Sequence, residues 1–533
     1  MTPLHVHSNY TLLNGTCRIE ELVEKAVINS LKSIALTDTN GMYGLIKFGK
    51  AMIEKGIKPI YGSLIDQPGD ERVYVLLLAR NNTGYEQLCK IITSRKLNDD
   101  FSLLTLMKNP PENLFIITPS IQLLEAAGDR ENIYAELIIT ERNKVQARKL
   151  YAYAKDKGIK LAASSPVYFL NPSDYDLHKA VTAIRLNTTL DNVPGGALAD
   201  NEFFFKEAAQ LQNIYKNIPD AVNNTEFIAG NCNVDLHLNE YKFPKFDVPS
   251  GTDSAAVLSE KCNEGLQWRY SPVSPAAVER LKMELGVIQE MNFTDYFLVV
   301  WDIVTEAKKR GMITIGRGSA ANSIVSYCLG LTDVDPIKYN LYFERFLNKG
   351  RSSPPDIDID FSWKERDEIV KYVFDKYGYE NVAMISTTVT FRARSAFREI
   401  ARAYGLTNDE ISKYSKYIPW TDAGNLSELS VMFPESRSLN FEIEPWKSIV
   451  ALASRLAGFP RHLSIHPGGI LITPKPITNF TAVEYAKNKG LGLIITQPDM
   501  YSIEDLGLVK IDLLSQRSLG VLRDIMDAIS KNS

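Results

Sequence analysis

Pro354-Pro355-Asp356-Ile357-Asp358-Ile359-Asp360-Phe361 alternates carboxylates with apolar side chains. Alternation with a period of two is typical of a β-strand, so the three aspartates should share one face of it. Carboxylates this near to one another repel each other. A divalent cation that takes oxygen ligands, Mg²⁺ or Mn²⁺, relieves the repulsion. The alternative interpretation is a solvated strand face or an acidic turn, and this stretch alone does not decide between the two.

Segments on either side of this stretch favour a phosphoryl-transfer site. Upstream stands Gly316-Arg317-Gly318-Ser319-Ala320-Ala321-Asn322-Ser323, which follows an apolar run. Small residues let backbone N–H groups approach an anion closely, and the side chains of Arg317 and Ser319 can donate to phosphate oxygens. The pattern predicts a phosphate-binding loop that is not a Walker loop.

Two further segments supply cations and another carboxylate. Phe343-Glu344-Arg345-Phe346 brings a guanidinium shortly before the aspartate strand, and residues 508–514 read as a second strand in which Lys510 and Asp512 share a face. Carboxylates on two strands, a phosphate loop and flanking cations are the components of a two-metal phosphoryl-transfer site.

Five motifs, in the order GRGSAANS, ERFLN, PPDIDIDF, PRHLSIHPGG and LGLVKIDLL, closely resemble the catalytic (alpha) subunit of bacterial DNA polymerase III, the C-family replicative polymerase. The resemblance covers essentially the whole chain. It implies a metal-binding catalytic triad of Asp356, Asp358 and Asp512 that holds two Mg²⁺ ions. It also implies triphosphate contacts from Arg317, Gly318, Ser319, Arg345 and Lys510. Asp360 competes with Asp356 for a place in the triad, because alternation alone does not say which carboxylates face the metals.

The resemblance also predicts the fold class and the division of the chain. We expect an α/β protein with a PHP-type βα barrel (1–240), a nucleotidyltransferase-type, polymerase beta-like palm (241–387 and 468–514), a mostly helical thumb (388–467) and the start of the fingers (515–533). Prolines and a glycine between residues 233 and 251 mark the first boundary. Members of the family are much longer. We therefore expect the fingers to be truncated here, and the chain to bind primed DNA yet polymerise poorly by itself.

The first part of the chain carries the signs of a barrel. Helical patterns at 19–29 and 45–54 alternate with short apolar strands at 34–36 and 58–60, which predicts repeated βα units. His5-Val6-His7 puts two imidazoles on one side of a strand, a pattern suited to a metal. The resemblance implies a polymerase and histidinol phosphatase (PHP) domain, which is a metal-binding barrel.

The metal pattern of that barrel is incomplete in this chain. Family members with an active site carry Asp-His, Cys-Glu and Asp-Val-His where this chain has Asp38-Thr39, Ser63-Leu64 and Pro166-Val167-Tyr168. The ligands that remain are His5, His7 and Asp38, with His178 nearby but outside the motif. We expect a structural barrel without metal, and one weakly held ion is the alternative, since the loss of even one ligand weakens binding.

Basic residues of the predicted thumb are candidates for contact with nucleic acid. Arg394, Arg398 and Arg402 recur every four residues and so form one ridge along a helix. Such ridges are often solvated faces, but beside a phosphoryl-transfer site in an acidic chain we favour contact with a DNA backbone. Arg461, His462 and His466 add donors. We interpret them as backbone or primer contacts and not as catalytic groups, because neither histidine has an evident carboxylate partner in sequence.

Composition limits the other classes of function. The chain has 60 basic and 64 acidic residues, so binding to nucleic acid must come from local patches. Its five cysteines lack CxxC spacing, which argues for reduced thiols in the cytoplasm and against structural zinc. No signal peptide and no bilayer-spanning apolar run is evident, so we expect no membrane partner.

The leading hypothesis is the N-terminal portion of a DNA-directed DNA polymerase, which transfers nucleotides to a primer 3′-hydroxyl during DNA replication. The expected partners are primed template DNA and dNTPs. Other replicase subunits, such as a sliding clamp, a clamp loader and a proofreading exonuclease, would bind through regions absent here. Two alternatives stay open: a PHP-domain phosphoesterase or 3′–5′ exonuclease, which the missing ligands disfavour, and a non-catalytic DNA-binding or assembly module.

Overall fold

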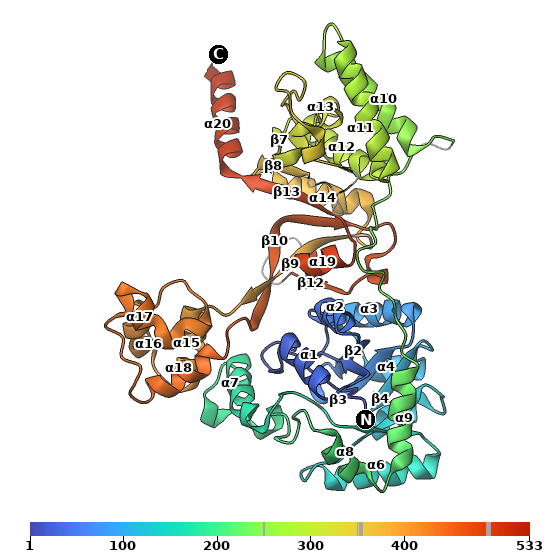
Figure 1. Cartoon of the computed structure of the whole chain (residues 1–533), viewed down its shortest axis with the longest axis vertical. Helices are drawn as coiled ribbons and strands as arrows, with labels where there is room; N and C mark the ends of the chain where they lie inside the picture. Colours follow the sequence, from blue (N-terminus) through green and yellow to red (C-terminus); the bar gives the residue numbers. More distant parts are fainter. Residues whose placement is uncertain (249–250, 349, 351–354, 356, 487–491, 533) are drawn as a thin grey trace.

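The computed structural model describes residues 1–248, 251–348, 350, 355, 357–486 and 492–532. Two sheets lie one above the other along the long axis of the molecule, and a separate group of helices projects to one side (Figure 1). None of the helices in the described part is long and apolar enough to cross a bilayer.

The first sheet has six strands in chain order. They are β1 (Ser33–Leu36), β2 (Lys58–Gln67), β3 (Asp70–Ala79), β4 (Leu114–Thr118), β5 (Ile133–Ile138) and β6 (Leu161–Ser164). The pairs at both ends are parallel, whereas β3 runs antiparallel to its two neighbours. Strands β1, β4, β5 and β6 are buried along their whole length, because helices cover the sheet, so they read as apolar runs without alternation.

Helices cover this sheet with their apolar faces. They are α1 (Ile19–Ile28), α2 (Leu45–Glu54), α3 (Asn82–Leu97), α4 (Leu103–Lys108), α5 (Ile121–Ala127), α6 (Lys144–Lys157), α8 (Ala208–Tyr215) and α9 (Pro219–Gly230). In α1, for example, Ile19, Leu22, Val23 and Ala26 are buried at helical spacing. The predicted βα units and PHP-type fold are confirmed, with the sheet curled into a half-barrel.

The second sheet has seven strands in the order β11-β12-β9-β10-β13-β8-β7. They are β7 (Thr314–Arg317), β8 (Asp358–Ser362), β9 (Val382–Thr390), β10 (Pro460–Ile472), β11 (Val483–Tyr485), β12 (Ile494–Asp499) and β13 (Lys510–Gln516). The helices of this unit are α10 (Ser254–Arg269), α11 (Pro275–Glu290), α12 (Thr294–Lys309), α13 (Ile324–Cys328), α14 (Arg366–Tyr377), α19 (Met500–Asp505) and α20 (Arg517–Asn532). Apolar residues of α12 and α14 share one core with Ile357, Ile359 and Phe361. The predicted polymerase-type α/β unit is therefore confirmed.

Strands β9 and β10 continue beyond the sheet as a long antiparallel pair, from Val382 opposite Ile472 to Thr390 opposite Pro460. Between them the chain forms the projecting helical group, α15 (Ala393–Ala403), α16 (Asn408–Ser415), α17 (Leu429–Met432) and α18 (Trp446–Ser454) (Figure 1). This group is the mostly helical unit that the resemblance implied.

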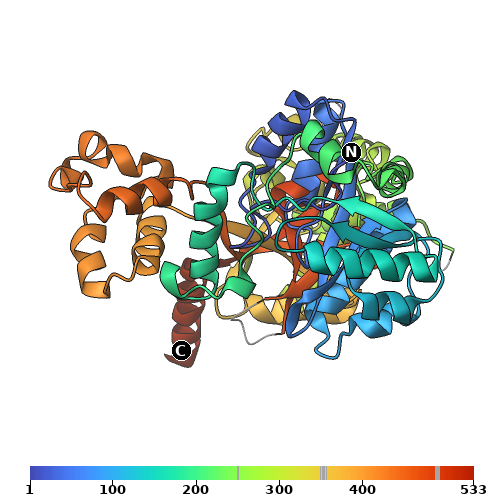
Figure 2. The ribbon, with the colours of Figure 1, turned by 90° about the horizontal axis from the view of Figure 1, so that it is seen from below.

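One helix of the first unit packs into the projecting group. Leu177, Ala180 and Val181 of α7 (Tyr175–Arg185) belong to the same core as Phe397 and Ile449. Figure 2 shows α7 between the projecting group and the rest of the first unit. An ion pair of 2.6 Å between Arg455 Nη2 and Asp174 Oδ1 adds a polar contact. The first unit therefore holds the projecting helices through packing as well as through charge.

Candidate active site

Three adjacent strands bring the predicted acidic and basic residues together. β13 runs parallel to β8 with Asp512 opposite Asp358, so both carboxylates lie on one face of the sheet. β7 pairs antiparallel with β8 and sets Arg317 opposite Asp358. Arg317 Nε lies 3.6 Å from both Asp358 Oδ2 and Asp360 Oδ1.

Strand β8 sorts its side chains by the expected period. Ile359 and Phe361 are fully buried in the core, whereas Asp358 and Asp360 meet Arg317 on the opposite face. Gln516 Nε2 also donates to Asp360 Oδ1 at 3.3 Å. Asp356 lies outside the described residues, so the competition between Asp356 and Asp360 is not decided here.

Lys510 and His466 flank Asp512. Lys510 Nζ donates to Asp512 Oδ2 at 2.8 Å, and His466 Nδ1 lies 3.6 Å from Asp512 Oδ1. The backbone N–H of Gly469 donates to His466 Nδ1 at 2.7 Å, so this nitrogen carries no hydrogen. Burial lowers the pKa of His466 in spite of the nearby Asp512 carboxylate, which is consistent with a neutral ring.

The pairing of β10 with β13 places a carboxylate near His466 that the sequence alone does not show. The sequence shows no evident carboxylate partner for either histidine of that segment. In the fold, Asp512 Oδ1 lies 3.6 Å from His466 Nδ1, which carries no hydrogen and so donates nothing to it. The sign of this close approach in the sequence is the glycine pair Gly468-Gly469, which comes shortly after His466. A Cβ on Gly468 would lie 2.4 Å from Leu514 Cδ2 and 3.3 Å from Asp512 Oδ1, so a larger residue here would require the Leu514 side chain to move.

The predicted phosphate loop lies at the end of β7. It forms the 3-10 turn η4 (Gly318–Asn322) before α13, with Gly318 at φ +71°, in the left-handed region. A Cβ on Gly316 would meet the carbonyl oxygen of Leu331 at 2.0 Å, so the strand can lie here only with glycine. Ser319 is half-buried, and Arg345 is exposed on a second turn, η5 (Phe343–Arg345).

The carboxylate oxygens on this sheet are suitable ligands for a divalent cation. Asp512 Oδ1 is buried and accepts no hydrogen bond among the described residues, and Asp358 stands beside it in register. Oxygen ligands of this kind suit Mg²⁺. Within the described ranges no group of three or more His, Cys, Asp or Glu side chains is spaced to hold a metal, and Asp356 falls outside those ranges.

The basic residues of the projecting helices have partners inside the protein. On α15, Arg394 Nε donates to the carbonyl oxygen of Ile418 at 2.9 Å, and Arg398 Nη1 to Ser415 Oγ at 3.0 Å. Arg402 and Arg461 share the carboxylate of Glu399, each at 2.8 Å. An arginine has five N–H donors, so each guanidinium keeps others for a phosphate. His462, on β10, is exposed.

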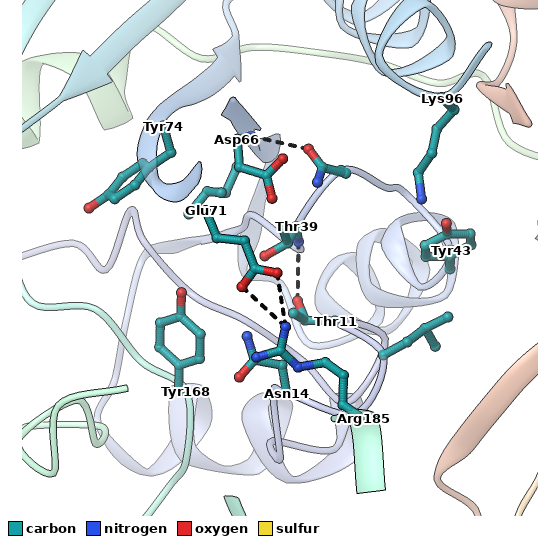
Figure 3. A pocket seen from close by; sticks show the side chains of 13 residues that line it. Thr11, Asn14, Thr39, Tyr43, Asp66, Glu71, Tyr74, Lys96, Tyr168 and Arg185 are labelled. Atoms are coloured by element: carbon teal, nitrogen blue, oxygen red, sulfur yellow. Dashed lines mark hydrogen bonds and ion pairs between the residues drawn. The ribbon is translucent and has the colours of Figure 1, made fainter. Parts of the chain in front are cut away.

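The first unit has a cavity of about 260 Å³ (Figure 3). Its lining includes Thr11, Asn14, Thr39, Asp66, Glu71, Lys96, Tyr168 and Arg185. Arg185 Nη1 pairs with both carboxylate oxygens of Glu71 at 3.1 Å, so each charge has a partner. The cavity is polar, with neither sign of charge in clear excess.

Behind Tyr168 lie the two remaining histidines of the metal motif. The Tyr168 and His7 ring centroids are 4.1 Å apart. His5 Nε2 lies 3.0 Å from His7 Nε2, and the two Nδ1 atoms contact Glu136 Oε1 at 2.7 Å and Thr11 Oγ1 at 3.0 Å. All four ring nitrogens thus face protein partners, and burial lowers the pKa of His7 far below its usual value. These residues do not fit a multi-metal centre as they stand.

Asp38 and Glu136 complete the same buried network. Asp38 accepts three hydrogen bonds of 2.7 Å, from the backbone and hydroxyl of Ser8 and from the hydroxyl of Thr11. Glu136, which the sequence argument missed, also accepts from the hydroxyls of Ser164 and Tyr74. Its only signal in the sequence was one carboxylate inside the buried strand IYAELI.

Comparison with known proteins agrees with both units. The family described as "Bacterial DNA polymerase III alpha NTPase domain" matches residues 256–515, and the PHP domain family matches residues 3–115. The fold and the two sites thus define a PHP domain joined to a polymerase-type α/β unit.

Three curated relatives match 99% of this chain. The DNA polymerase III subunit alpha of Bacillus subtilis (strain 168) is 35% identical over 49% of its own length, and that of Escherichia coli (strain K12) is 32% identical over 49%. The error-prone DNA polymerase of Symbiobacterium thermophilum is 33% identical over 52%. The chain therefore carries a PHP domain and the NTPase domain of the bacterial DNA polymerase III alpha family. It spans about half the length of the curated relatives that it matches.

Proposed function

We propose that the chain is the PHP, palm and thumb portion of a DNA-directed DNA polymerase, which adds nucleotides to a primer 3′-hydroxyl in DNA replication. The observation that carries the proposal is the register of Asp512 with Asp358, which sets two carboxylates side by side with Lys510 and Arg317 next to them. The family relationship supports the same activity.

The carboxylates would hold the metals. Asp358 and Asp512, with either Asp356 or Asp360, are the proposed ligands of two Mg²⁺ ions. When bound, Mg²⁺ lowers the pKa of a coordinated hydroxyl and neutralises charge on the reacting phosphate. Lys510 holds Asp512 Oδ2 and so leaves the buried Oδ1 for the cation.

The phosphate loop and its neighbours would bind the incoming dNTP. Ser319 and the backbone N–H of Gly318 are proposed to donate to the triphosphate, while Arg317, Arg345 and Lys510 supply positive charge. Arg317 and Arg345 are exposed at the face of the sheet and on η5, where a ligand can reach them. The triphosphate would therefore lie between β7, η5 and β13.

Primed DNA would bind along the projecting helices. Arg394, Arg398 and Arg402, with Arg461, His462 and His466, are the proposed backbone and primer contacts. Their support is the distribution of charge: these residues cluster on α15 and β10 in a chain that is slightly acidic as a whole.

The remaining assignments follow the same scheme. We propose a PHP domain at 1–240 without metal, a palm at 241–387 and 468–514, a thumb at 388–467 and the start of the fingers at 515–533. Sliding clamp, clamp loader and exonuclease would bind other parts of such an enzyme. All five cysteines are free and buried, which supports a reducing compartment, the bacterial cytoplasm.

A primer-extension assay and a 3′–5′ nuclease assay on one preparation test this function. The enzyme would carry this chain together with the half of the relatives that it does not span. We expect Mg²⁺-dependent extension that Asp512→Asn abolishes, and no nuclease activity. Nuclease activity that is lost in His7→Gln would instead support the PHP-domain phosphoesterase. Binding of primed duplex without extension in any condition would support a non-catalytic module.

A further inference from the structure

A buried ion pair on α11 lies behind the phosphate loop. Glu284 is fully buried, and Arg280 Nε donates to its Oε1 at 2.6 Å. A buried carboxylate is costly unless it is paired and fully hydrogen-bonded, so its other contacts decide what it stabilises. Neither residue belongs to the proposed metal or DNA contacts.

One oxygen of Glu284 holds the end of the phosphate loop. Its Oε2 accepts from Ser323 Oγ at 2.7 Å and from the backbone N–H of Val325 at 3.2 Å. Ser323 directly follows η4, and its hydroxyl also caps α13 by accepting from the N–H of Ser326 at 3.1 Å. The carboxylate therefore fixes the point where the loop that bears Ser319 enters a helix.

The guanidinium of Arg280 reaches the second turn of the triphosphate site. Its Nη2 donates to the carbonyl oxygens of Asn322, at 3.2 Å, and Leu341, at 3.0 Å. The guanidinium carbon also lies 6.0 Å from the centroid of Phe343, the first residue of η5. One ion pair thus contacts both the loop of Ser319 and the segment that presents Arg345.

We propose that Glu284 and Arg280 are positioning residues for the triphosphate, because they set the spacing between the loop of Ser319 and the turn of Arg345. The inference rests on the proposed function. Groups that bind one ligand from two separate segments keep their affinity only while the segments are held in place. Losing the ion pair should therefore weaken triphosphate binding selectively, since α15 and β10, which would contact DNA, lie elsewhere.

Glu284→Gln is the sharpest test, because it keeps the shape of the side chain. One oxygen becomes an NH₂ group, which must face either Arg280 or the donors of Ser323 and Val325. The matched control is Asp302→Asn, another carboxylate of this unit. Asp302 accepts from Tyr372, Lys376 and Tyr377 and contacts neither segment.

Three quantities are measured on the full chain: the affinity for dATP with Mg²⁺, the affinity for primed duplex, and hydrogen exchange of 316–325 and 341–347. In Glu284→Gln we expect about tenfold weaker dATP binding, the loss typical of one charged hydrogen bond, and exchange about tenfold faster in both segments. Duplex affinity should stay unchanged. Arg280→Lys, which keeps the charge but not the fork of donors, should fall between. Asp302→Asn should leave all three quantities unchanged.

Wild-type dATP affinity and exchange in a folded Glu284→Gln chain would overturn the inference, as would equal losses in Asp302→Asn. A wild-type chain that binds no dATP would refute the proposed nucleotide site. The exchange readout would then still judge the ion pair: faster exchange confined to the two segments supports its positioning role, and unchanged exchange refutes it.

Discussion

Groups from three strands surround Asp512: Lys510 on its own strand, His466 on β10 and, by register, Asp358 on β8. In an enzyme that includes the rest of the relatives' length, Asp512→Asn or Asp358→Asn should lower the rate of nucleotide addition at least about a thousandfold, about 4 kcal/mol, because each removes a metal ligand. The fold should remain, since neither side chain carries core packing. Primer extension measures the rate, and near-wild-type extension by either variant would contradict the assignment.

The same assay decides between two carboxylates. Asp360 already accepts from Gln516 and lies 3.6 Å from Arg317, contacts that suit a supporting role as well as a metal ligand. If Asp356 completes the triad, Asp356→Asn should be as damaging as Asp512→Asn and Asp360→Asn should be milder. The reverse order would assign Asp360 to the metals.

His178 gives the first unit a pH dependence. Its Nδ1–H donates to the carbonyl oxygen of Asn14 at 2.8 Å, and its Nε2 accepts from the N–H of Ala199 at 3.0 Å, so the neutral ring is required. Burial, with a smaller contribution from Arg185, lowers the pKa of His178 to about 4. In the unfolded chain the imidazole has its ordinary pKa of about 6.5, so it takes up a proton at a higher pH than in the folded chain. The contribution of His178 to the free energy of unfolding should therefore be fully present above about pH 6.5. It should be lost as the pH drops towards 4, by about 3 kcal/mol at most.

Hydrogen exchange of α7 as a function of denaturant measures this dependence. The free energy of opening should fall between pH 6.5 and 4 in the wild type and change less in His178→Gln, whose amide cannot take up a proton. Equal pH dependence in the two proteins would show that another group is responsible.

At the scale of elements, α15 and β10 share one carboxylate between two arginines. Glu399 holds Arg402 and Arg461, each at 2.8 Å, and both are proposed DNA contacts. Glu399→Gln would release them from the charge. We expect a severalfold rise in affinity for primed duplex at low salt and a steeper dependence on salt, because more phosphates are neutralised. Lower affinity, or an unchanged slope of log affinity against log salt, would indicate that the arginines act inside the protein.

Local patterns predicted what depends on neighbouring residues only. The alternation in β8 and the four-residue spacing of Arg394, Arg398 and Arg402 are set by strand and helix geometry, which the sequence shows directly. The position of Asp512 near His466 and the surroundings of the buried Glu136 depend on which strands pair and in which register. The contacts of Glu136 with His5 and of His466 with Asp512 join segments that are not neighbours in the sequence, so a single sequence leaves them open.

At the scale of the whole molecule, the first unit and the projecting helices share a core. Leu177→Ala on α7 should destabilise by about 2–5 kcal/mol, as usual for a buried leucine, and exchange should rise in α15 and α18 as well as in α7. Leu186→Ala is the control, because Leu186 is exposed and follows the same helix. Faster exchange confined to α7 would contradict the coupling. This contact was not foreseen, since more than two hundred residues separate α7 from α15 in the sequence, although the two helices share a core in the fold.

The carboxylates of β8 and β13, and not the histidines of the first unit, are the proposed metal-dependent site. Electron paramagnetic resonance, which detects Mn²⁺ bound to the full chain in the presence of dATP and primed duplex, tests this assignment. We predict bound Mn²⁺ in the wild type and in His7→Gln, and its loss in Asp358→Asn and Asp512→Asn. Mn²⁺ that stays bound in both aspartate variants and is lost in His7→Gln would instead assign the metal to the first unit.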